Sequence, residues 1–134
     1  MSESGSRSQK QAFSIRKRVG SFRHAFRGIA TILRTQHNTW IHLLATVLVV
    51  SLGCCFPLAS LEWIALVLAI GLVWLAEALN SAVEFLADEV SLEERELIGK
   101  AKDAAAAGVL FAAAAAVVVG ILVFGPHLMR MRAP

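Results

Sequence analysis

The sequence lacks the motifs that hold nucleotides in the common soluble folds. Neither GxxxxGK(S/T) nor GxGxxG occurs among its 134 residues, and the absence of the first excludes a Walker-type nucleotide site. Cysteine is also scarce, since only the adjacent Cys54 and Cys55 are present. Neighbouring cysteines rarely bond each other, and two ligands do not make a zinc site. We therefore interpret this pair as small apolar residues near a helix end.

The first 40 residues lack a long apolar run and nearly lack acidic residues. The first apolar run begins near residue 41, too deep for a signal peptide, so we expect none. Before residue 36 the only acid is Glu3, and the basic residues are Arg7, Lys10, Arg16, Lys17, Arg18, Arg23, Arg27 and Arg34. Such a segment suits the anionic cytoplasmic face of a membrane. Nucleic acid could also attract it, but the apolar remainder of the chain argues against that partner.

The rest of the chain is rich in hydrophobic residues, which make up 57% of the whole. This fraction is too high for an ordinary soluble domain. Three segments, roughly 38–56, 61–86 and 102–124, approach or exceed the roughly 20 residues that cross a bilayer as a helix. We therefore predict an all-α membrane protein with three transmembrane helices, of which the first is marginal in length.

The N-terminal region divides into two parts. Residues 1–14 are rich in Ser, Gly and Gln, and we expect this basic N-terminus to be disordered. Over residues 15–36, apolar side chains recur at intervals of three and four, with arginines over much of the rest, which predicts an amphipathic helix lying in the membrane interface. A helix packed on a soluble core is the alternative, but the chain contains no obvious soluble core. We assign residues 15–126 to one membrane domain and 127–134 to a short C-terminal tail.

The distribution of basic residues predicts the orientation in the membrane. The link between the first two spans carries no Lys or Arg, whereas the second link carries Arg95, Lys100 and Lys102. Arg130 and Arg132 are the only basic residues on the opposite side. The positive-inside rule then places the N-terminus and the second link in the cytoplasm, with the protein in the cytoplasmic (inner) membrane.

A strip of polar residues interrupts the second span. Glu77, Asn80, Glu84 and Asp88 stand at i, i+3, i+7 and i+11, which is one face of a helix. A carboxylate at bilayer depth costs several kcal/mol, so it is rarely without a function. Three spans could hardly shield Glu77 and Glu84 from lipid, and the third span is rich in alanine, which lets helices approach closely. We therefore expect a homo-oligomer.

The two glutamates suit different tasks. They lie about 10 Å apart along the helix axis, too far to share one small ion. Glu84, nearer the cytoplasm, suits a magnesium ligand, and the deeper Glu77 suits a general base for a buried hydroxyl. An interhelical hydrogen-bond network and an ion path are the alternatives for this face. Lys102 and Asp103, at the start of the third span, suit a phosphate contact, or simply a charged helix start at the membrane surface.

The residues of this strip and of the second link form a longer pattern. Glu77-Ala-Leu-Asn80-Ser81-Ala82-Val-Glu84, followed by Asp88, Glu96 and Gly99-Lys-Ala-Lys102-Asp103, resembles the signature of the small prokaryotic diacylglycerol kinase family, which includes the undecaprenol kinases. The resemblance covers about residues 16–124. It implies a homotrimer with active sites shared between subunits, ATP and Mg²⁺, and phosphorylation of a membrane lipid alcohol.

The resemblance also implies roles for single residues. Glu77 matches the catalytic glutamate that accepts the lipid hydroxyl proton, with Asn80 beside it, and Glu84 matches a metal ligand that borders ATP. Nucleotide contacts are implied for Lys17 (or equally Arg18), His24, Glu93, Glu94, Arg95, Lys102 and Asp103. The link often carries a histidine where Arg95 stands.

One position departs from the family pattern. Gln36 stands where the diacylglycerol kinase branch has a second metal-binding glutamate, and it offers a carbonyl oxygen but no charge. We expect Gln36 to bind the metal more weakly, or another carboxylate to help.

The segments 25–29 and 34–43 look more like the undecaprenol kinase branch and slightly favour a polyprenol substrate. His42, in the second of these segments, could face the substrate, but we expect it to be hydrogen-bonded between helices.

Two functions of another class remain open at this stage. A small oligomeric transporter could use Glu77 and Glu84 as proton or cation sites. It would not explain the Lys102–Asp103 pair or the basic helix. A membrane scaffold without catalysis would leave the buried acids unexplained.

Overall fold

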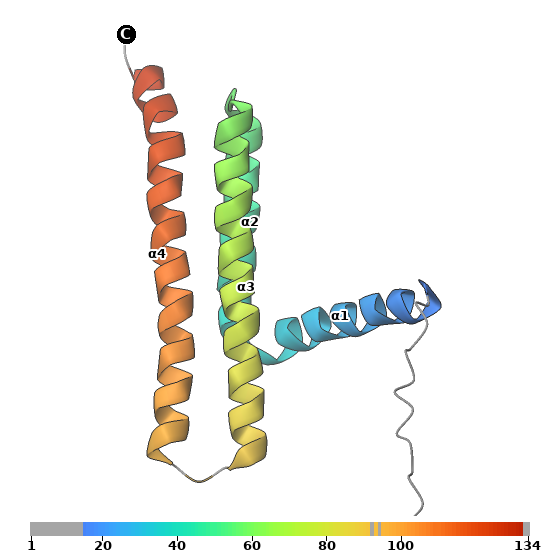
Figure 1. The fold of residues 1–134 in the computed structure, drawn as a ribbon. Coiled ribbons are helices and arrows are strands. Elements are labelled where there is room, and N and C mark those ends of the chain that lie inside the picture. Colours follow the sequence, from blue (N-terminus) through green and yellow to red (C-terminus); the bar gives the residue numbers. More distant parts are fainter. Residues whose placement is uncertain (1–14, 92, 94, 133–134) are drawn as a thin grey trace, which may run out of the picture.

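The computed structural model describes residues 15–91, 93 and 95–132, with the side chains of residues 20–131 inside these ranges. Four helices and no strand make up this part of the chain (Figure 1). They are α1 (Ile15–Thr35), α2 (His37–Cys55), α3 (Ser60–Val90) and α4 (Glu96–Arg132). The last three are long and apolar enough to cross a membrane. The predicted all-α architecture, with three spans and an N-terminal helix, is confirmed.

The three long helices lie side by side, and α1 projects sideways from them (Figure 1). The lower ends of α3 and α4, with the link that joins them, extend beyond the level of α1. If α1 lies in the membrane interface, as its amphipathic pattern predicts, the α3–α4 link projects out of the bilayer on the same side. The predicted basic N-terminus, residues 1–14, lies outside the described residues.

The corner between α1 and α2 is a single residue. Gln36 is extended, with φ −104° and ψ 113°, and its backbone N–H still donates to the Ile32 carbonyl at 2.9 Å. One extended residue between two helices turns the chain from the direction of α1 to that of α2. This sharp turn holds the Gln36 side chain beside the N-terminus of α2.

The third span is longer than the hydropathy pattern predicts. α4 begins at Glu96, six residues earlier than expected, and continues through Pro126 to Arg132. The Lys100 ammonium pairs with the Glu96 carboxylate one turn away, which supports helix in this charged segment. The helix therefore includes most of the segment that the sequence analysis assigns to the C-terminal tail.

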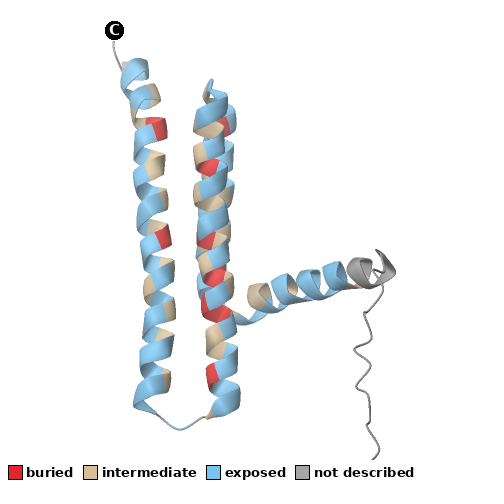
Figure 2. Cartoon of the chain, viewed as in Figure 1, coloured by how far each residue is buried: buried red, intermediate tan, exposed pale blue. Residues whose placement is uncertain are grey.

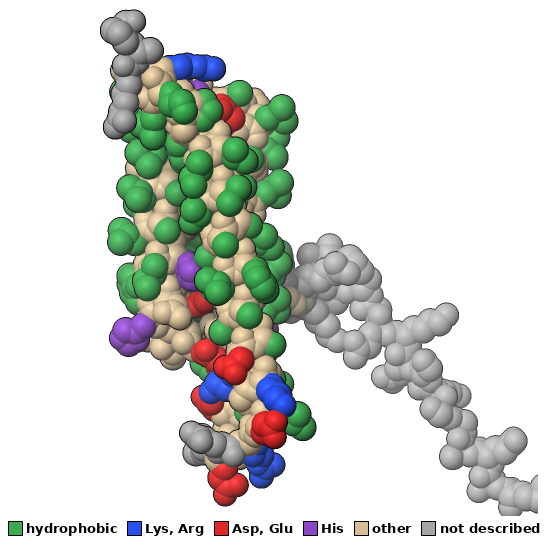
Figure 3. Space-filling view, turned by 90° about the vertical axis from the view of Figure 1, so that its left-hand side faces the viewer, with side chains coloured by type: hydrophobic (Ala, Val, Ile, Leu, Met, Phe, Trp, Pro, Cys, Tyr) green, Lys and Arg blue, Asp and Glu red, His purple; other side chains and the backbone are tan. Residues whose placement is uncertain are grey.

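The interior of the bundle is narrow. α3 and α4 make most of the interhelical contacts. Large apolar side chains such as Leu44, Leu68 and Ile121 are mostly exposed. Figure 2 shows few buried positions along the helices. Figure 3 shows apolar side chains over most of the bundle face in view, with most of the charged side chains on this face near the α3–α4 link. So much exposed apolar surface suits contact with lipid or with further subunits.

The end of the bundle far from the link is closed by contacts between all three spans. Gly53 of α2 lies against Trp63 of α3, so closely that an added Cβ would stand 2.7 Å from the indole ring. Phe56, after α2, lies 5.7 Å between ring centroids from His127 of α4. His127 Nε2 lies 3.0 Å from a carboxylate oxygen of Glu62 in α3. These contacts fix the three helices relative to one another at this end.

Candidate active site

Three buried polar residues of α3 form the centre of the candidate site. Glu77, Asn80 and Ser81 are 2%, 7% and 0% exposed. The Ser81 hydroxyl donates to the backbone carbonyl of Glu77 at 2.9 Å, so its hydrogen bond stays within α3. Glu77 and Asn80 instead direct their side chains away from the backbone of α3. Their burial agrees with the single polar face that their spacing predicts.

The two oxygens of the Glu77 carboxylate have different surroundings. Thr39 of α2 donates its hydroxyl to Oε1 at 3.1 Å, and Thr39 itself is fully buried. Oε2 is buried and accepts no hydrogen bond from the described residues. The His42 Nε2 atom lies 3.7 Å from Oε2, outside hydrogen-bond distance. One oxygen of Glu77 is therefore fixed and the other is left available for chemistry.

Glu84 is held by two amides. Asn80 donates from Nδ2 to Glu84 Oε1 at 3.1 Å, and Gln36 donates from Nε2 to Glu84 Oε2 at 2.8 Å. The Gln36 contact joins the α1–α2 corner to α3. The carbonyl oxygen of Asn80 is buried without a hydrogen-bond partner among the described residues. The corner at Gln36 thus brings together the two residues predicted to bind metal.

The donor atoms at this point suit a hard cation. Glu84 offers a carboxylate, and Gln36 and Asn80 offer amide oxygens, of which that of Asn80 is unpartnered. Magnesium is commonly held by one or two protein carboxylates, with phosphate and water completing the shell. No cluster of three or more His, Cys, Asp or Glu side chains able to hold a metal occurs in the part of the chain that the structure describes. These residues therefore fit Mg²⁺ as a partial site that needs ligands from elsewhere.

A cavity of about 310 Å³ lies in front of the polar strip. Its polar wall includes Glu77, Asn80, Glu84 and His42, and its apolar wall comes from Ala106, Val109, Leu110 and Ala113 of α4. A second cavity, of about 350 Å³ and almost wholly apolar, shares Ile41, His42 and Ala113 with the first and extends along the bundle to Phe124. The carboxylates therefore lie at a boundary between a polar site and an apolar passage.

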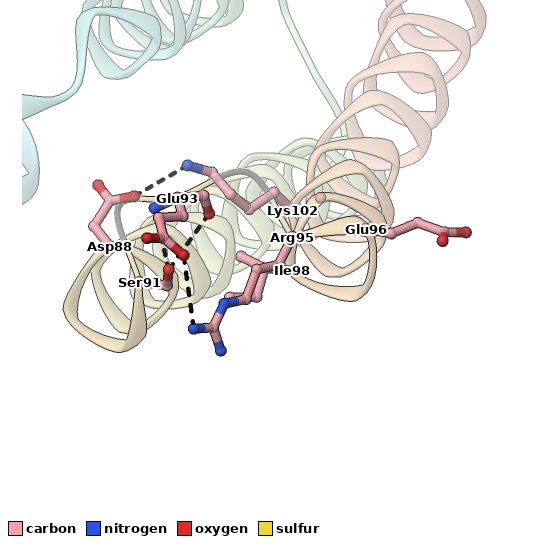
Figure 4. Close-up of a pocket in the computed structure, with 8 residues that line it drawn as sticks. Asp88, Ser91, Glu93, Arg95, Glu96, Ile98 and Lys102 are labelled. Atoms are coloured by element: carbon pink, nitrogen blue, oxygen red, sulfur yellow. Dashed lines mark hydrogen bonds and ion pairs between the residues drawn. The ribbon is translucent and has the colours of Figure 1, made fainter.

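A charged cluster surrounds the α3–α4 link (Figure 4). The Lys102 ammonium lies 3.1 Å from Asp88, and the Arg95 guanidinium lies 4.0 Å from Glu93. A cavity of about 530 Å³ adjoins these four side chains, with Ser91, Glu96, Ile98 and Gly99. Both pairs are substantially exposed, so water screens them and they can exchange partners at little cost. Such a cluster can bind a polyphosphate through its cations.

The structure brings most of the predicted site residues into two groups. Glu77, Asn80, Glu84 and Gln36 meet at the polar strip, and Glu93, Arg95 and Lys102 meet at the link. Lys17 and Glu94 cannot be placed, because the Lys17 side chain and the whole of Glu94 lie outside the described residues. His24 is exposed on α1 and lines neither cavity.

Two further predicted residues lie near the link. Asp103, predicted to contact the nucleotide with Lys102, is exposed and does not line the link cavity, whereas Lys102 does. Its contact with the nucleotide stays a prediction. Asp88, predicted on the same face of α3 as Glu77, pairs with Lys102. Eleven residues separate it from Glu77, which is roughly 16 Å along the helix.

Thr39 is the site residue that the sequence analysis missed. Its spacing of three residues from His42 places both side chains on one face of α2, which is a signal that could have been found. His42 itself lies between helices as expected, but it lines the cavity and makes no hydrogen bond to Glu77 at 3.7 Å.

Comparison with known proteins gives a family and three relatives. Residues 23–124 match the sequence model of the family described as prokaryotic diacylglycerol kinase. An undecaprenol kinase of Bacillus subtilis is 37% identical over 108 residues, which is 81% of this chain and 88% of the relative. A diacylglycerol kinase of Synechocystis is 38% identical over 83% of this chain and 64% of its own length. A diacylglycerol kinase of Escherichia coli is 34% identical over 62% and 68%.

Proposed function

Because the chain belongs to the prokaryotic diacylglycerol kinase family, it is a membrane lipid kinase. We propose that it phosphorylates a polyprenol at the polar strip of α3 that contains Glu77. The observation that carries this assignment of the site is the Glu77 carboxylate, which is 2% exposed in a residue that lines a cavity; Thr39 holds one oxygen and the other has no hydrogen-bond partner among the described residues. The family matches do not support the transporter alternative.

Glu77 is the proposed general base. The hydroxyl of the lipid alcohol enters the cavity, and Glu77 Oε2 accepts its proton as the alcohol oxygen bonds to the γ-phosphorus of ATP and the bond to the bridging oxygen breaks. Phosphoryl transfer needs little covalent chemistry from a protein beyond positioning, charge neutralisation and a proton acceptor. Asn80, one turn from Glu77, donates to Glu84 through its amide and so helps to hold Glu84 at the proposed metal position.

The nucleotide is proposed to bind between the strip and the link. Glu84 and Gln36 would hold Mg²⁺, which when bound neutralises the charge of the phosphates. Lys102 and Arg95, already beside the link cavity, would contact the phosphates. Glu93 adjoins the same cavity, and contacts from Lys17, His24, Glu94 and Asp103 stay predictions. The link extends beyond α1, which favours entry of ATP from the aqueous side (Figure 1).

Polyprenol is favoured over diacylglycerol for two reasons. The Bacillus subtilis undecaprenol kinase aligns over 88% of its length, against 68% for the Escherichia coli diacylglycerol kinase. The almost wholly apolar cavity of about 350 Å³ also adjoins the polar one at His42 and extends to Phe124, so it could hold the first part of a single lipid chain. Both kinds of relative remain similar to this chain, so the substrate is the point to test.

We further propose a homotrimer in the cytoplasmic membrane with the N-terminus inside. The exposed apolar surface of the helices and the small residues of α4 suit packing against further subunits. The arginines of α1 and the basic residues of the link would then all face the anionic cytoplasmic leaflet. Chemical cross-linking in native membranes is expected to end at a trimer.

The test is phosphate transfer from labelled ATP by the purified protein in mixed micelles, with undecaprenol and diacylglycerol offered separately. Faster transfer to undecaprenol is expected. Transfer to diacylglycerol alone would overturn the substrate proposal and leave the kinase intact. Transfer to neither, from protein shown to be oligomeric and folded, would contradict the proposed function.

A further inference from the structure

Each proposed turnover leaves a proton on Glu77, and this proton must be removed before the next turnover. Glu77 is 2% exposed and its Oε2 atom is buried, so direct loss of the proton to bulk water is slow. Unless it is deprotonated, the next lipid hydroxyl meets a neutral carboxylic acid instead of a base. A neighbouring group able to accept a proton is therefore needed.

The cavity in front of Glu77 contains few such groups. From α2 it is lined by Asn38, Ile41 and His42, and from α4 by apolar side chains. From α3 the other polar neighbours are Asn80 and Glu84. Both oxygens of Glu84 already accept amide hydrogen bonds. Among the described residues that line this cavity, His42 is thus the titratable group best placed to serve Glu77.

The oxygen of Glu77 that lies nearer to His42 is Oε2, the one proposed to take the proton. Thr39 donates to Oε1, and Oε2 is the oxygen that lies 3.7 Å from His42 Nε2. Thr39 and His42 stand three residues apart on α2, so one helix face carries both contacts. A small side-chain rotation would bring Nε2 within hydrogen-bond distance of Oε2. The His42 side chain is 14% exposed against 2% for Glu77, so it lies nearer to the surroundings.

We propose that His42 is a positioning residue that resets Glu77 in each catalytic cycle. Glu77 Oε2 takes the hydroxyl proton, and this proton then passes to Nε2 of neutral His42. The O–H bond on Glu77 breaks, an N–H bond forms, and a carboxylate faces an imidazolium. Before the next cycle His42 loses its proton to water through the cavity. Thr39 keeps Oε2 in the orientation that this transfer requires. The inference rests on the proposed function, since it assumes Glu77 as the base.

Two substitutions test the role of His42. His42→Leu keeps a side chain of similar size that cannot take a proton. His42→Ala leaves space for added imidazole. For both we expect kcat to fall about 100-fold, the lower end of what a positioned proton-transfer group contributes. The KM for ATP is expected to stay within about twofold, because His42 does not line the link cavity proposed for the nucleotide. Imidazole is expected to raise kcat of His42→Ala and not of His42→Leu.

The matched control is His37→Ala, because His37 is an exposed histidine on the same helix. It is expected to retain activity and show no response to imidazole. Thr39→Val is expected to lower kcat without rescue, since imidazole cannot replace a hydroxyl that orients Oε1. Folding of each variant is checked by its thermal unfolding midpoint and its oligomer size in detergent.

Three results would overturn the role of His42. They are wild-type kcat in folded His42→Leu, a loss confined to KM, and no response to imidazole in folded His42→Ala that binds both substrates. Each of these leaves the kinase itself standing. Failure of the proposed function would instead show as no phosphate transfer by the unaltered protein.

Discussion

Gln36→Glu is the substitution with the most informative expected result, because it restores a carboxylate at the position where this chain departs from its family pattern. Gln36 Nε2 donates to Glu84 Oε2 at 2.8 Å. The substitution removes this hydrogen bond to a charged group, worth about 1.5–3 kcal/mol. It also places a second negative charge beside Glu84. Two such charges about 4 Å apart repel by about 4 kcal/mol at an effective dielectric constant of about 20.

The two carboxylates will relieve part of this cost by sharing a proton and by turning toward water, since both side chains are half-buried. We therefore expect the metal-free protein to lose about 3 kcal/mol of stability, less than the sum of the two terms. Mg²⁺ reverses the sign of the effect, because a dication between two carboxylates is bound more tightly than one beside a carboxylate and an amide. The magnesium concentration for half-maximal activity is expected to fall at least about tenfold, which corresponds to about 1.4 kcal/mol.

Two measurements check this reasoning. The first is the thermal unfolding midpoint in detergent. In EDTA the midpoint of Gln36→Glu is expected to lie below that of the unaltered protein, and added Mg²⁺ is expected to restore it. A magnesium titration of phosphate transfer at fixed ATP gives the affinity. His37→Glu, which adds the same charge at an exposed neighbouring position, is the control and is expected to change neither value by much. An unchanged or raised magnesium requirement in Gln36→Glu would refute the assignment of Gln36 and Glu84 as the metal site.

Three further substitutions test separate parts of the structure. Gly53→Val would force a side chain into Trp63, where even a Cβ would stand 2.7 Å from the ring, and is expected to destabilise the protein by about 1–3 kcal/mol without changing the KM for ATP. Gly71→Ala is the matched control, because nothing lies within 4 Å of its added Cβ, and it is expected to be neutral or stabilising by up to about 1 kcal/mol in thermal unfolding. Asp88→Asn releases Lys102 from an exposed ion pair, so stability is expected to change by less than about 1 kcal/mol, and the KM for ATP is expected to fall; a raised KM would contradict the view that Lys102 binds phosphate.

The parts of the structure that follow from local sequence patterns were predictable. Hydropathy locates the three spans, and the spacing of Glu77, Asn80 and Glu84 places them on one face of α3, because the helical repeat depends only on neighbouring residues. The start of α4 was predicted six residues late because Glu96, Lys100 and Lys102 do not match an apolar pattern. Their helix is supported by charge pairing, which hydropathy does not detect.

Contacts between distant residues were not predictable in the same way. The contact between Gln36 and Glu84 depends on a single extended residue between α1 and α2, and it was suggested by family resemblance and not by composition. Thr39 shares a face of α2 with His42, but its contact with Glu77 follows only from the packing of α3 against α2. Lys102 lines the link cavity and its neighbour Asp103 does not, because adjacent residues on a helix point in different directions.

The central claim is that the free oxygen of Glu77 takes the proton of a lipid hydroxyl during phosphate transfer. The most direct test compares single-turnover transfer from labelled ATP to undecaprenol by the unaltered protein, Glu77→Gln, and the control Glu89→Gln, in which an exposed carboxylate of the same helix is changed. We expect Glu77→Gln to lose at least about 100-fold in rate, with its oligomer and its binding of ATP retained, and Glu89→Gln to react like the unaltered protein. A Glu77→Gln enzyme that transfers phosphate at the unaltered rate would contradict the account.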